Sequence, residues 1–249
     1  MDVGQGDGIY ISSGDGSAFF IDGGSSNVSG VGEYRILPFL KSKGVKEIDY
    51  WFVSHTDSDH ISGLCEILHE GYKIENIILG ERCSNDDKYR DLLSLAENAG
   101  IKIVHMNEGD SICTRNMKIT CLGPLTVNNE AIGKDKNENS LVLFVEYRFE
   151  SETYRSLFAG DISSEMEEKL CKAGVLEDVD LFKSNHHGSN YSNSELLLAT
   201  ICPENIVISC SESNVYGHPG SKAIERMEAC GAQIFYTMEN GQITFPLIQ

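Results

Sequence analysis

The sequence predicts an α/β fold, in which short strands and helices alternate along most of the 249 residues. Short apolar segments rich in β-branched and aromatic residues recur through the chain, and segments with helical periodicity lie between many of them. In addition, four of the predicted strands end in His or Asp residues. Polar residues at the ends of neighbouring strands are typical of α/β proteins, whose sites lie at that edge of the sheet.

The N-terminal part predicts a hairpin, a helix and a buried strand. Residues 8–13 and 17–22 are apolar and are joined by the turn "GDG". Residues 32–44 predict a short helix, and "IDYWFVS" at 48–54 predicts a buried strand. The segment "MDVGQGD" has strand-like hydrophobicity at residue 1 without a leader, which suggests that the chain was cut from a longer one.

The rest of the chain continues in the same manner and predicts one domain. Polar residues 126–140 predict a surface connection within that domain. The predicted helices are 60–70 and 86–99, the predicted strands are 74–79, 101–105, 117–122, 140–147 and 154–159, and three βα steps occupy 162–235 before the closing segment "GQITFPL".

Composition limits the classes of protein to consider. The chain is 41% hydrophobic and 23% charged, as in ordinary soluble domains, and no segment approaches the roughly 18 apolar residues of a membrane-spanning helix. The net charge of −18 argues against nonspecific binding to nucleic acid or anionic lipid. None of the eight cysteines forms a CxxC pair, which favours free buried thiols in a reducing setting over disulfides.

Five of the seven histidines fall in three clusters, and each cluster follows a predicted strand. The clusters are "HTDSDH" at 55–60, "SNHHGS" at 184–189 and "YGHPG" at 216–220, and a fourth strand ends in Asp161. Imidazole and carboxylate ligands without thiolate suit Zn²⁺, Mn²⁺ or Fe. The spacing HxDxDH would let one tight loop face two neighbouring cations, so we expect half of a two-metal site there.

Structural roles are the alternative for individual residues. Asp57 or Asp59 could cap the helix that begins near residue 60, and Asp161 or Ser163 could cap the next one. His69 and His105 lie inside a predicted helix and strand and are interpreted as structural. Neighbouring residues of an extended segment point in opposite directions, so we expect only one of His186 and His187 to be a metal ligand.

The motifs also resemble a known family. In order and spacing, "DVGQGD", "FIDGG", "SHTDSDH", "NENSLVL", "FAGDIS", "KSNHHGS" and "YGHP" resemble the metallo-β-lactamase-like domain at the C-terminal end of the ComEC competence proteins. The resemblance spans essentially the whole chain. It implies a four-layer αββα sandwich with a hydrolytic dimetal site, in a bacterial domain excised from a protein that also contains a membrane channel for DNA uptake.

The resemblance implies roles for individual residues. Asp161 would bridge two divalent ions, Mn or Zn. His55 and Asp57 would hold one of them, Asp59, His60 and a later histidine the other, and the later histidines counted among the metal residues are His187 and His218. The catalytic group would comprise Asp59, Asp161 and His187. Supporting or substrate-contacting roles would belong to Asp7, Asp22, Asn139, Ser140, His186 and Ser189.

Two departures from the broader fold family concern the metals. Asp57 stands where HxHxDH would have its second histidine, as is common in the ComEC group. No histidine precedes the strand of Asp161, and Asn139 and Ser140 are the candidates for its position. Oxygen ligands in place of imidazoles shift the preference toward a harder ion such as Mn²⁺, or toward one tight site and one filled only with substrate.

The function expected from these features is metal-dependent phosphodiester hydrolysis. A pair of divalent ions can activate a bridging hydroxide and offset the charge on the attacked phosphate. The resemblance implies a nuclease acting on DNA during natural transformation, in a soluble domain that the parent protein would hold at the bacterial membrane. Two alternatives remain: a free-standing hydrolase of a small phosphodiester or ester, similar to phosphorylcholine esterases, which the −18 charge favours, or a non-catalytic module that guides DNA.

Overall fold

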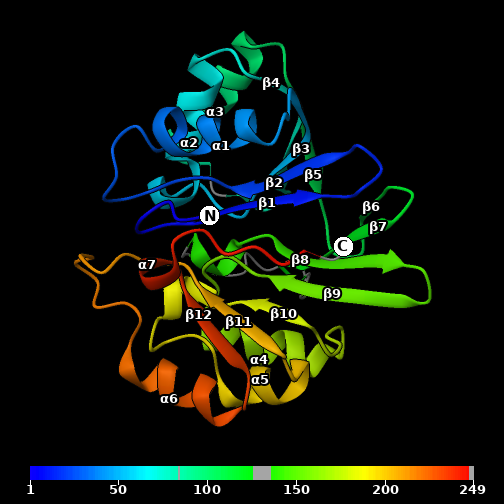
Figure 1. Cartoon of the computed structure of the whole chain (residues 1–249), viewed down its shortest axis with the longest axis vertical. Helices are drawn as coiled ribbons and strands as arrows, with labels where there is room; N and C mark the ends of the chain where they lie inside the picture. The colour runs from blue at the N-terminus through cyan, green and yellow to red at the C-terminus, as the bar shows by residue number, and fades with distance from the viewer. Residues whose placement is uncertain (84, 126–135, 247–249) are drawn as a thin grey trace.

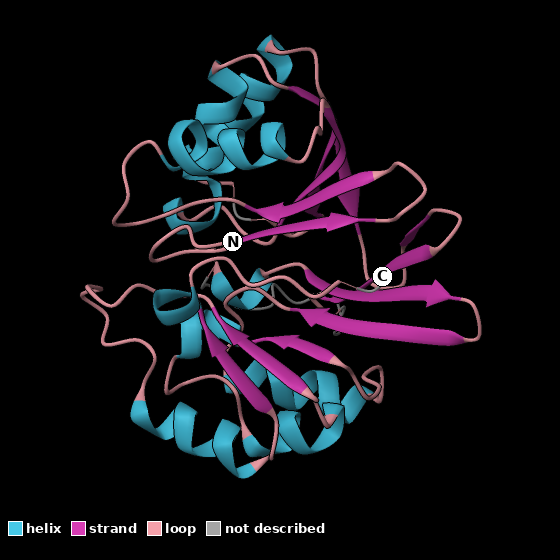
Figure 2. Cartoon of the chain, in the orientation of Figure 1, coloured by secondary structure: helices cyan, strands magenta, loops and turns pink. Residues whose placement is uncertain are grey.

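Two β-sheets lie face to face, and helices cover the outer face of each, so the fold has four layers (Figures 1 and 2). The computed structural model describes residues 1–83, 85–125 and 136–246. The predicted α/β class and the αββα sandwich are confirmed. Residues 126–135 of the predicted polar connection lie outside the described residues.

The first sheet contains the N-terminal strands in the order β1-β2-β3-β4-β5. The predicted hairpin is formed by β1 and β2, which pair antiparallel, and the following pairs are parallel. Parallel strands are joined by helices, as the alternation of the sequence predicts. The bounds are β1 Gly8–Ser12, β2 Ala18–Asp22, β3 Glu47–Val53, β4 Lys73–Gly80 and β5 Lys102–Met106.

The second sheet has the order β12-β11-β10-β9-β8-β7-β6 and is also mixed. Its strands from β9 to β12 are parallel, and those from β6 to β9 pair antiparallel. The bounds are β6 Ser111–Cys113, β7 Met117–Gly123, β8 Val142–Phe149, β9 Glu152–Phe158, β10 Leu181–Lys183, β11 Asn205–Ile208 and β12 Gln233–Tyr236.

The helices divide between the two outer faces (Figure 1). The helix predicted at 32–44 begins as one turn of π-helix, η1, and continues as α1. Helices α1 to α3 cover the first sheet, and α4 to α6 cover the second. The bounds are η1 Gly32–Ile36, α1 Leu37–Ser42, α2 Ser58–His69, α3 Asp87–Asn98, η2 Asn137–Asn139, α4 Ser164–Ala173, η3 Asn185–Gly188, α5 Glu195–Ile201, α6 Ser221–Ala229 and α7 Thr237–Asn240.

Alternation along the central strands explains how one sheet can be buried on both faces. In β3, Trp51 and Val53 pack against the helices, whereas Phe52 lies in the apolar layer between the sheets. The same occurs in β2, where Phe20 faces the helices and Phe19 faces the second sheet. Since side chains of a strand point alternately to its two faces, a continuous apolar run fills two cores.

Three details differ from the predictions. The short strand β6 has no sequence signal of its own because it is defined by pairing with β7. Residues 2–7, whose hydrophobicity is strand-like, are not a strand but a turn packed against α2. All eight cysteines are free, as expected, but Cys113, Cys202 and Cys230 are exposed rather than buried.

The four predicted strand ends meet at one edge of the sandwich. The HTDSDH segment follows β3 of the first sheet, whereas Asp161, the HHGS segment and the loop to His218 follow β9, β10 and β11 of the second. The functional residues therefore come from both sheets and gather where the sheet edges face each other.

Candidate metal centre

The segment after β3 delivers the first group of side chains. Asp57 has the extended backbone of an N-cap residue before α2, yet its side chain makes no cap hydrogen bond. Its carboxylate is therefore not used for capping, the structural alternative raised by the sequence. Asp59 and His60 lie in the first turn of α2, with His60 fully buried.

Two glycines allow the N-terminal loops to pack against this helix start. A Cβ atom on Gly24 would lie 2.4 Å from the Ser58 carbonyl oxygen, and one on Gly6 would lie 2.4 Å from that of Asp59. Real Cβ atoms essentially never approach a backbone oxygen so closely. The "DVGQGD" and "FIDGG" motifs thus require glycine at these positions, and their packing places Asp7 and Asp22 beside the buried face of His60.

Asp161 follows β9 and is not the cap of α4. The cap is Ser163, whose side chain accepts a hydrogen bond from the Glu165 N–H. The Asp161 side chain is 4% exposed, and its Oδ1 has no hydrogen-bond partner in the described part of the chain. The capping alternative for Asp161 is therefore wrong, and its carboxylate points into the cluster.

His186 and His187 do not point in opposite directions, because this segment is not extended. Both residues have left-handed backbone conformations, with φ of 51° and 53°. Their Nε2 atoms lie 3.7 and 3.4 Å from the same oxygen, Asp161 Oδ2. His187 is buried, whereas the side chain of His186 is 30% exposed at the mouth of the site.

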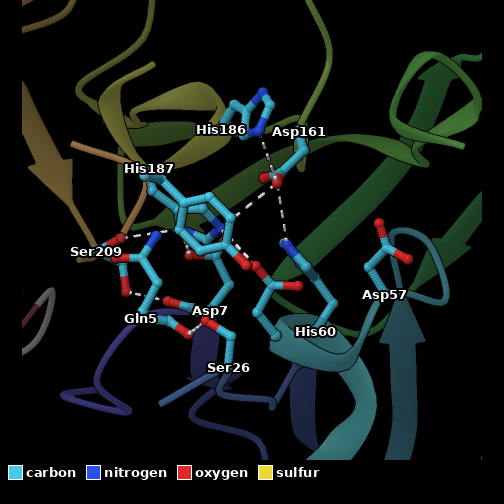
Figure 3. Close-up of polar contacts among 12 residues, drawn as sticks. Gln5, Asp7, Ser26, Asp57, His60, Asp161, His186, His187 and Ser209 are labelled. Atoms are coloured by element: carbon cyan, nitrogen blue, oxygen red, sulfur yellow. Dashed lines mark hydrogen bonds and ion pairs between the residues drawn. The ribbon is translucent and has the colours of Figure 1, made fainter. Parts of the chain in front are cut away.

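Asp161 lies at the centre of a cluster of imidazole and carboxylate groups (Figure 3). The Nε2 atom of His60 is 3.3 Å from Asp161 Oδ2, and that of His187 is 3.6 Å from Asp59 Oδ2. One ligand atom from each of four residues lies within 4.8 Å of the others; the residues are Asp59, His60, Asp161 and His187. Two carboxylates and two imidazoles form a donor set suited to a divalent transition-metal ion.

The buried polar atoms of the cluster fit a metal. Among the described residues, the Nε2 atoms of His55, His60 and His187 and Oδ1 of Asp161 are buried without a hydrogen-bond partner. Such orphaned atoms are rare in folded proteins because burial without a partner is costly. An ion bound among His60 Nε2, His187 Nε2 and the Asp161 carboxylate would give these three groups a partner, and His55 Nε2 would need a second ion.

The opposite ring nitrogens are held by fixed partners. His187 Nδ1 lies 2.9 Å from the Ser209 carbonyl oxygen, which can only accept, so Nδ1 carries the proton. His60 Nδ1 lies 2.9 Å from Asp22 Oδ2, and Asp22 itself accepts from the N–H and hydroxyl of Ser54. A proton fixed on Nδ1 leaves the Nε2 lone pair for a metal.

Asp7, Asp22 and His60 form a second group of potential ligands within reach of one another. However, the Asp22 carboxylate lies on the Nδ1 side of His60, and Asp7 forms a buried ion pair with Lys183 at 2.7 Å. Asp7 Oδ1 is also 3.3 Å from His187 Nδ1. These contacts favour roles in orienting the imidazoles, as the sequence predicts for Asp22.

The charges of the cluster lower the pKa of its central carboxylate and raise the pKa values of two of its imidazoles. Burial alone would raise the pKa of Asp161, but His187 and His60 hold it well below its ordinary value. Burial alone would lower the pKa of His60 and of His187, but the surrounding carboxylates, Asp161 first, raise both well above 6.5. Burial and the neighbouring His60 lower the pKa of His55 to about 4. In the absence of a metal, these shifts favour the protonated forms of His60 and His187 beside an ionised Asp161.

The other predicted ligands lie at greater distances. His55 Nε2 is 3.8 Å from Asp57 Oδ2, and Asp57 also contacts Lys136 at 3.2 Å and Lys88 at 3.5 Å. His218 stands beyond His186, with ring centroids 5.3 Å apart, and its buried Nδ1 has no partner among the described residues. Burial, and then His186, lower the pKa of His218 to about 4, so its ring is neutral.

The predicted supporting residues behave differently from one another. Ser140 is buried, with Oγ 3.4 Å from His55 Nδ1 and from the N–H of Asp161. Asn139 is half-buried in η2. Ser189 is buried and accepts from the Tyr191 N–H, which makes it part of the loop rather than of the cleft.

Lys183 and Glu167 support the site although no motif in the sequence indicates a role for either. Lys183 neutralises Asp7, and its place directly before "SNHH" was the only available signal. Glu167 is fully buried and accepts from Asn185 Nδ2 and from the N–H groups of Asn193 and Ser194. It therefore holds the loop that carries His186 and His187, and the helical pattern of α4 gave no indication of this.

An open cleft of about 530 Å³ leads to the cluster. Asp161 and His186 lie in its wall together with Asp57 and Asp59, whereas Lys88 and Tyr216 come from α3 and from the loop between β11 and α6. This volume is ordinary for a small-molecule site. The cluster can therefore be reached by a substrate from solvent.

The chain is similar to known proteins in sequence and in fold. Residues 1–75 match the model of the metallo-beta-lactamase superfamily. The chain is 27% identical to ComE operon protein 3 of Bacillus subtilis over 98% of its own length and 32% of that protein's, and 29% identical to competence protein ComA of Neisseria gonorrhoeae over 85% and 27%. It thus spans about a third or less of these relatives.

Among solved structures, the metallo-beta-lactamase fold protein YhfI of Bacillus subtilis is similar, with a TM-score of 0.57 at 11% identity over 93% of this chain and 89% of that one. No helix in the described ranges has the length and apolar character needed to cross a membrane. The family model, the relatives and the shared fold agree with the motifs and with the four-layer architecture. The chain is a metallo-beta-lactamase-fold domain related to the competence proteins ComE operon protein 3 and ComA.

Proposed function

We propose that this chain is a metal-dependent phosphodiesterase that hydrolyses DNA. The observation that carries the proposal is the buried Asp161 carboxylate surrounded by imidazoles at an accessible cleft. Asp59, His60, Asp161 and His187 would hold one divalent ion, and His55 and Asp57 would contribute to a second. Bound divalent ions supply an activated water and offset the negative charge of a phosphodiester.

The chain's own residues have three roles in this proposal. Asp22 and the Ser209 carbonyl fix the protons of His60 and His187 on Nδ1. Lys88 and Lys136 place positive charge beside Asp57 at the mouth of the cleft, where the substrate's phosphate would enter. His186, partly exposed and 3.7 Å from Asp161, is placed to donate a proton to the leaving oxygen.

The relation to competence proteins supports DNA as the polymer, and the net charge of −18 is the feature that opposes it. Divalent ions bound among the aspartates of the cleft wall, with Lys88 beside them, would reduce this opposition because binding depends on the field at the site rather than on total charge. That residues 1–249 form a single hydrolase domain excised from a membrane-associated bacterial protein remains part of the same proposal.

A metal panel with matched substrates tests the function. The purified chain, stripped of metal and supplied separately with Mn²⁺, Zn²⁺ and Mg²⁺, should cleave DNA when single-stranded and plasmid substrates are compared. Mn²⁺ should be the most effective ion because Asp57 offers an oxygen ligand in place of an imidazole. Asp161→Asn should lose this activity. Asp87→Asn, which changes a 92% exposed carboxylate in the same way, is its matched control and should keep full activity. Hydrolysis confined to small chromogenic phosphodiesters would favour the small-substrate alternative, and binding of DNA without turnover would favour the guiding module.

A further inference from the structure

Tyr216 is an exposed aromatic residue in the wall of the cleft. It is 57% exposed and lines the same cleft as Asp161 and His186. Large exposed aromatic side chains contribute nothing to a core, so one placed beside a candidate site invites a role in binding. The other strongly exposed tyrosines, Tyr34 and Tyr191, do not line this cleft.

The ring of Tyr216 is held in place by its own loop. It stacks on His218 with centroids 5.8 Å apart and an angle of 24° between the planes. The Asn214 side chain accepts from the N–H groups of Tyr216 and His218 and donates to the carbonyl oxygens of Ser211 and His218. A loop braced in this manner presents the aromatic surface with little loss of conformational entropy on binding.

The position of Tyr216 relative to Asp161 sets the scale of the ligand. The contacts run from Tyr216 to His218, from His218 to His186 at 5.3 Å between centroids, and from His186 Nε2 to Asp161 at 3.7 Å. Two ring contacts thus separate the tyrosine from the central carboxylate. A ligand that contacts both the central carboxylate and Tyr216 must therefore extend beyond a single phosphate group, along the cleft that both residues line.

Lys88 completes the arrangement from α3. Its Nζ is 3.5 Å from Asp57 Oδ1, its side chain is 44% exposed, and it lines the cleft together with Tyr216. A cation that follows the backbone and an aromatic ring that receives a base are the two elements by which proteins bind single strands without sequence preference.

We propose that Tyr216 is a base-stacking platform that makes the site selective for unpaired nucleotides. The inference rests on the proposed phosphodiesterase function and narrows its substrate to single strands or splayed ends, since the bases of an intact duplex are already stacked on one another. Tyr216 is thus a specificity-determining residue, not a catalytic one.

Binding to a short oligothymidylate and to an abasic strand with the same number of phosphates tests the proposal. With Ca²⁺ as the divalent ion, fluorescence anisotropy should show the wild type binding the oligothymidylate about tenfold tighter than the abasic strand, the fold-change that corresponds to about 1.4 kcal/mol of stacking energy. Tyr216→Ala should abolish this difference. Tyr216→Phe should keep it, and so should the control Tyr34→Ala, which removes an exposed tyrosine outside the cleft.

The outcomes separate this inference from the proposed function. Hydrolysis of DNA without any preference for bases, or a preference that survives Tyr216→Ala, would overturn the role of Tyr216 and leave the phosphodiesterase intact. Base-dependent binding that Tyr216→Ala abolishes, without hydrolysis under any metal, would support the platform and refute the enzyme. Competition by phosphorylcholine stronger than by thymidine monophosphate, lost in Tyr216→Ala, would show that the ring receives a quaternary ammonium group instead and would overturn the inference.

Discussion

Asp161→Asn removes the negative charge at the centre of the cluster while keeping the side-chain shape. In the structure, Asp161 Oδ2 lies 3.3 and 3.4 Å from the Nε2 atoms of His60 and His187, which would contact the same ion. At an effective dielectric constant of about 20, a unit charge about 4 Å from another contributes about 4 kcal/mol. For a divalent ion we therefore expect metal affinity to fall by at least about 10³-fold.

The fold should survive this substitution. Ser163, not Asp161, caps α4, and His60 and His187 keep Asp22 and Asp7 beside them. We expect a loss of no more than about 3 kcal/mol in the free energy of unfolding. Ser163→Ala is the matched control, because it should lose about 1 kcal/mol of stability from the cap and leave metal affinity unchanged.

Calorimetric titration with Mn²⁺ and Zn²⁺ measures the metal affinity, urea denaturation measures the free energy of unfolding, and nuclease assays measure turnover. Turnover should fall by several orders of magnitude in Asp161→Asn along with the metal affinity. Unchanged metal affinity and turnover in a folded Asp161→Asn protein would refute the assignment of this carboxylate to the metal centre.

Three further predictions concern the surroundings of Asp161. First, the raised pKa values of His60 and His187 mean that both rings are protonated at neutral pH in the metal-free protein, so an ion must displace protons. Metal affinity should therefore rise with pH through neutrality, and calorimetric titrations in buffers of different ionisation enthalpy should show proton release. The two protonated rings also stabilise the metal-free fold. That stabilisation is complete below pH about 6.5 and is lost as the pH rises through the raised pKa values. Zero proton release at pH 7 would contradict the protonated rings. Second, Asp57→His should raise Zn²⁺ affinity relative to Mn²⁺ and lower Mn²⁺-supported turnover, since an imidazole replaces an oxygen ligand; the same metal preference as the wild type in calorimetry and kinetics would mean that Asp57 is not a ligand. Third, Lys183→Met leaves the buried Asp7 carboxylate without its cation and should lower the free energy of unfolding by about 3–5 kcal/mol in urea denaturation. The control Lys169→Met breaks an exposed pair with Glu165 and should lower it by less than about 1 kcal/mol. Equal losses would show that the buried pair does not stabilise the fold.

The architecture could be predicted because its signals are local. The spacing of apolar residues in a short segment is enough to indicate a strand or a helix. This holds for the hairpin of β1 and β2, the buried strand β3 and helices α2 and α3. The gathering of His60 and Asp161 could also be anticipated, since ligand-type residues at several strand ends imply one shared edge. The sequence gives little information on which strands pair with one another. The short strand β6, for example, is defined only by its hydrogen bonds to β7.

The supporting residues of the site were beyond prediction for the same reason. Lys183 lies 176 positions from Asp7 in the sequence, so no pattern links the two, and their buried ion pair depends on how the sheets meet. The direction of His186 depends on a left-handed backbone that neither histidine signals. An extended segment would have turned one ring away, and the structure instead turns both toward Asp161.

The central claim is that Asp59, His60, Asp161 and His187 hold a divalent ion, and anomalous diffraction tests it most directly. Crystals grown with Mn²⁺ or Zn²⁺ and measured at the absorption edge of each metal should show a peak within bonding distance of His60 Nε2, His187 Nε2 and an Asp161 oxygen, with a second peak, where present, toward His55 and Asp57. Clear density for these side chains with no anomalous peak near His60 at saturating metal would contradict the account.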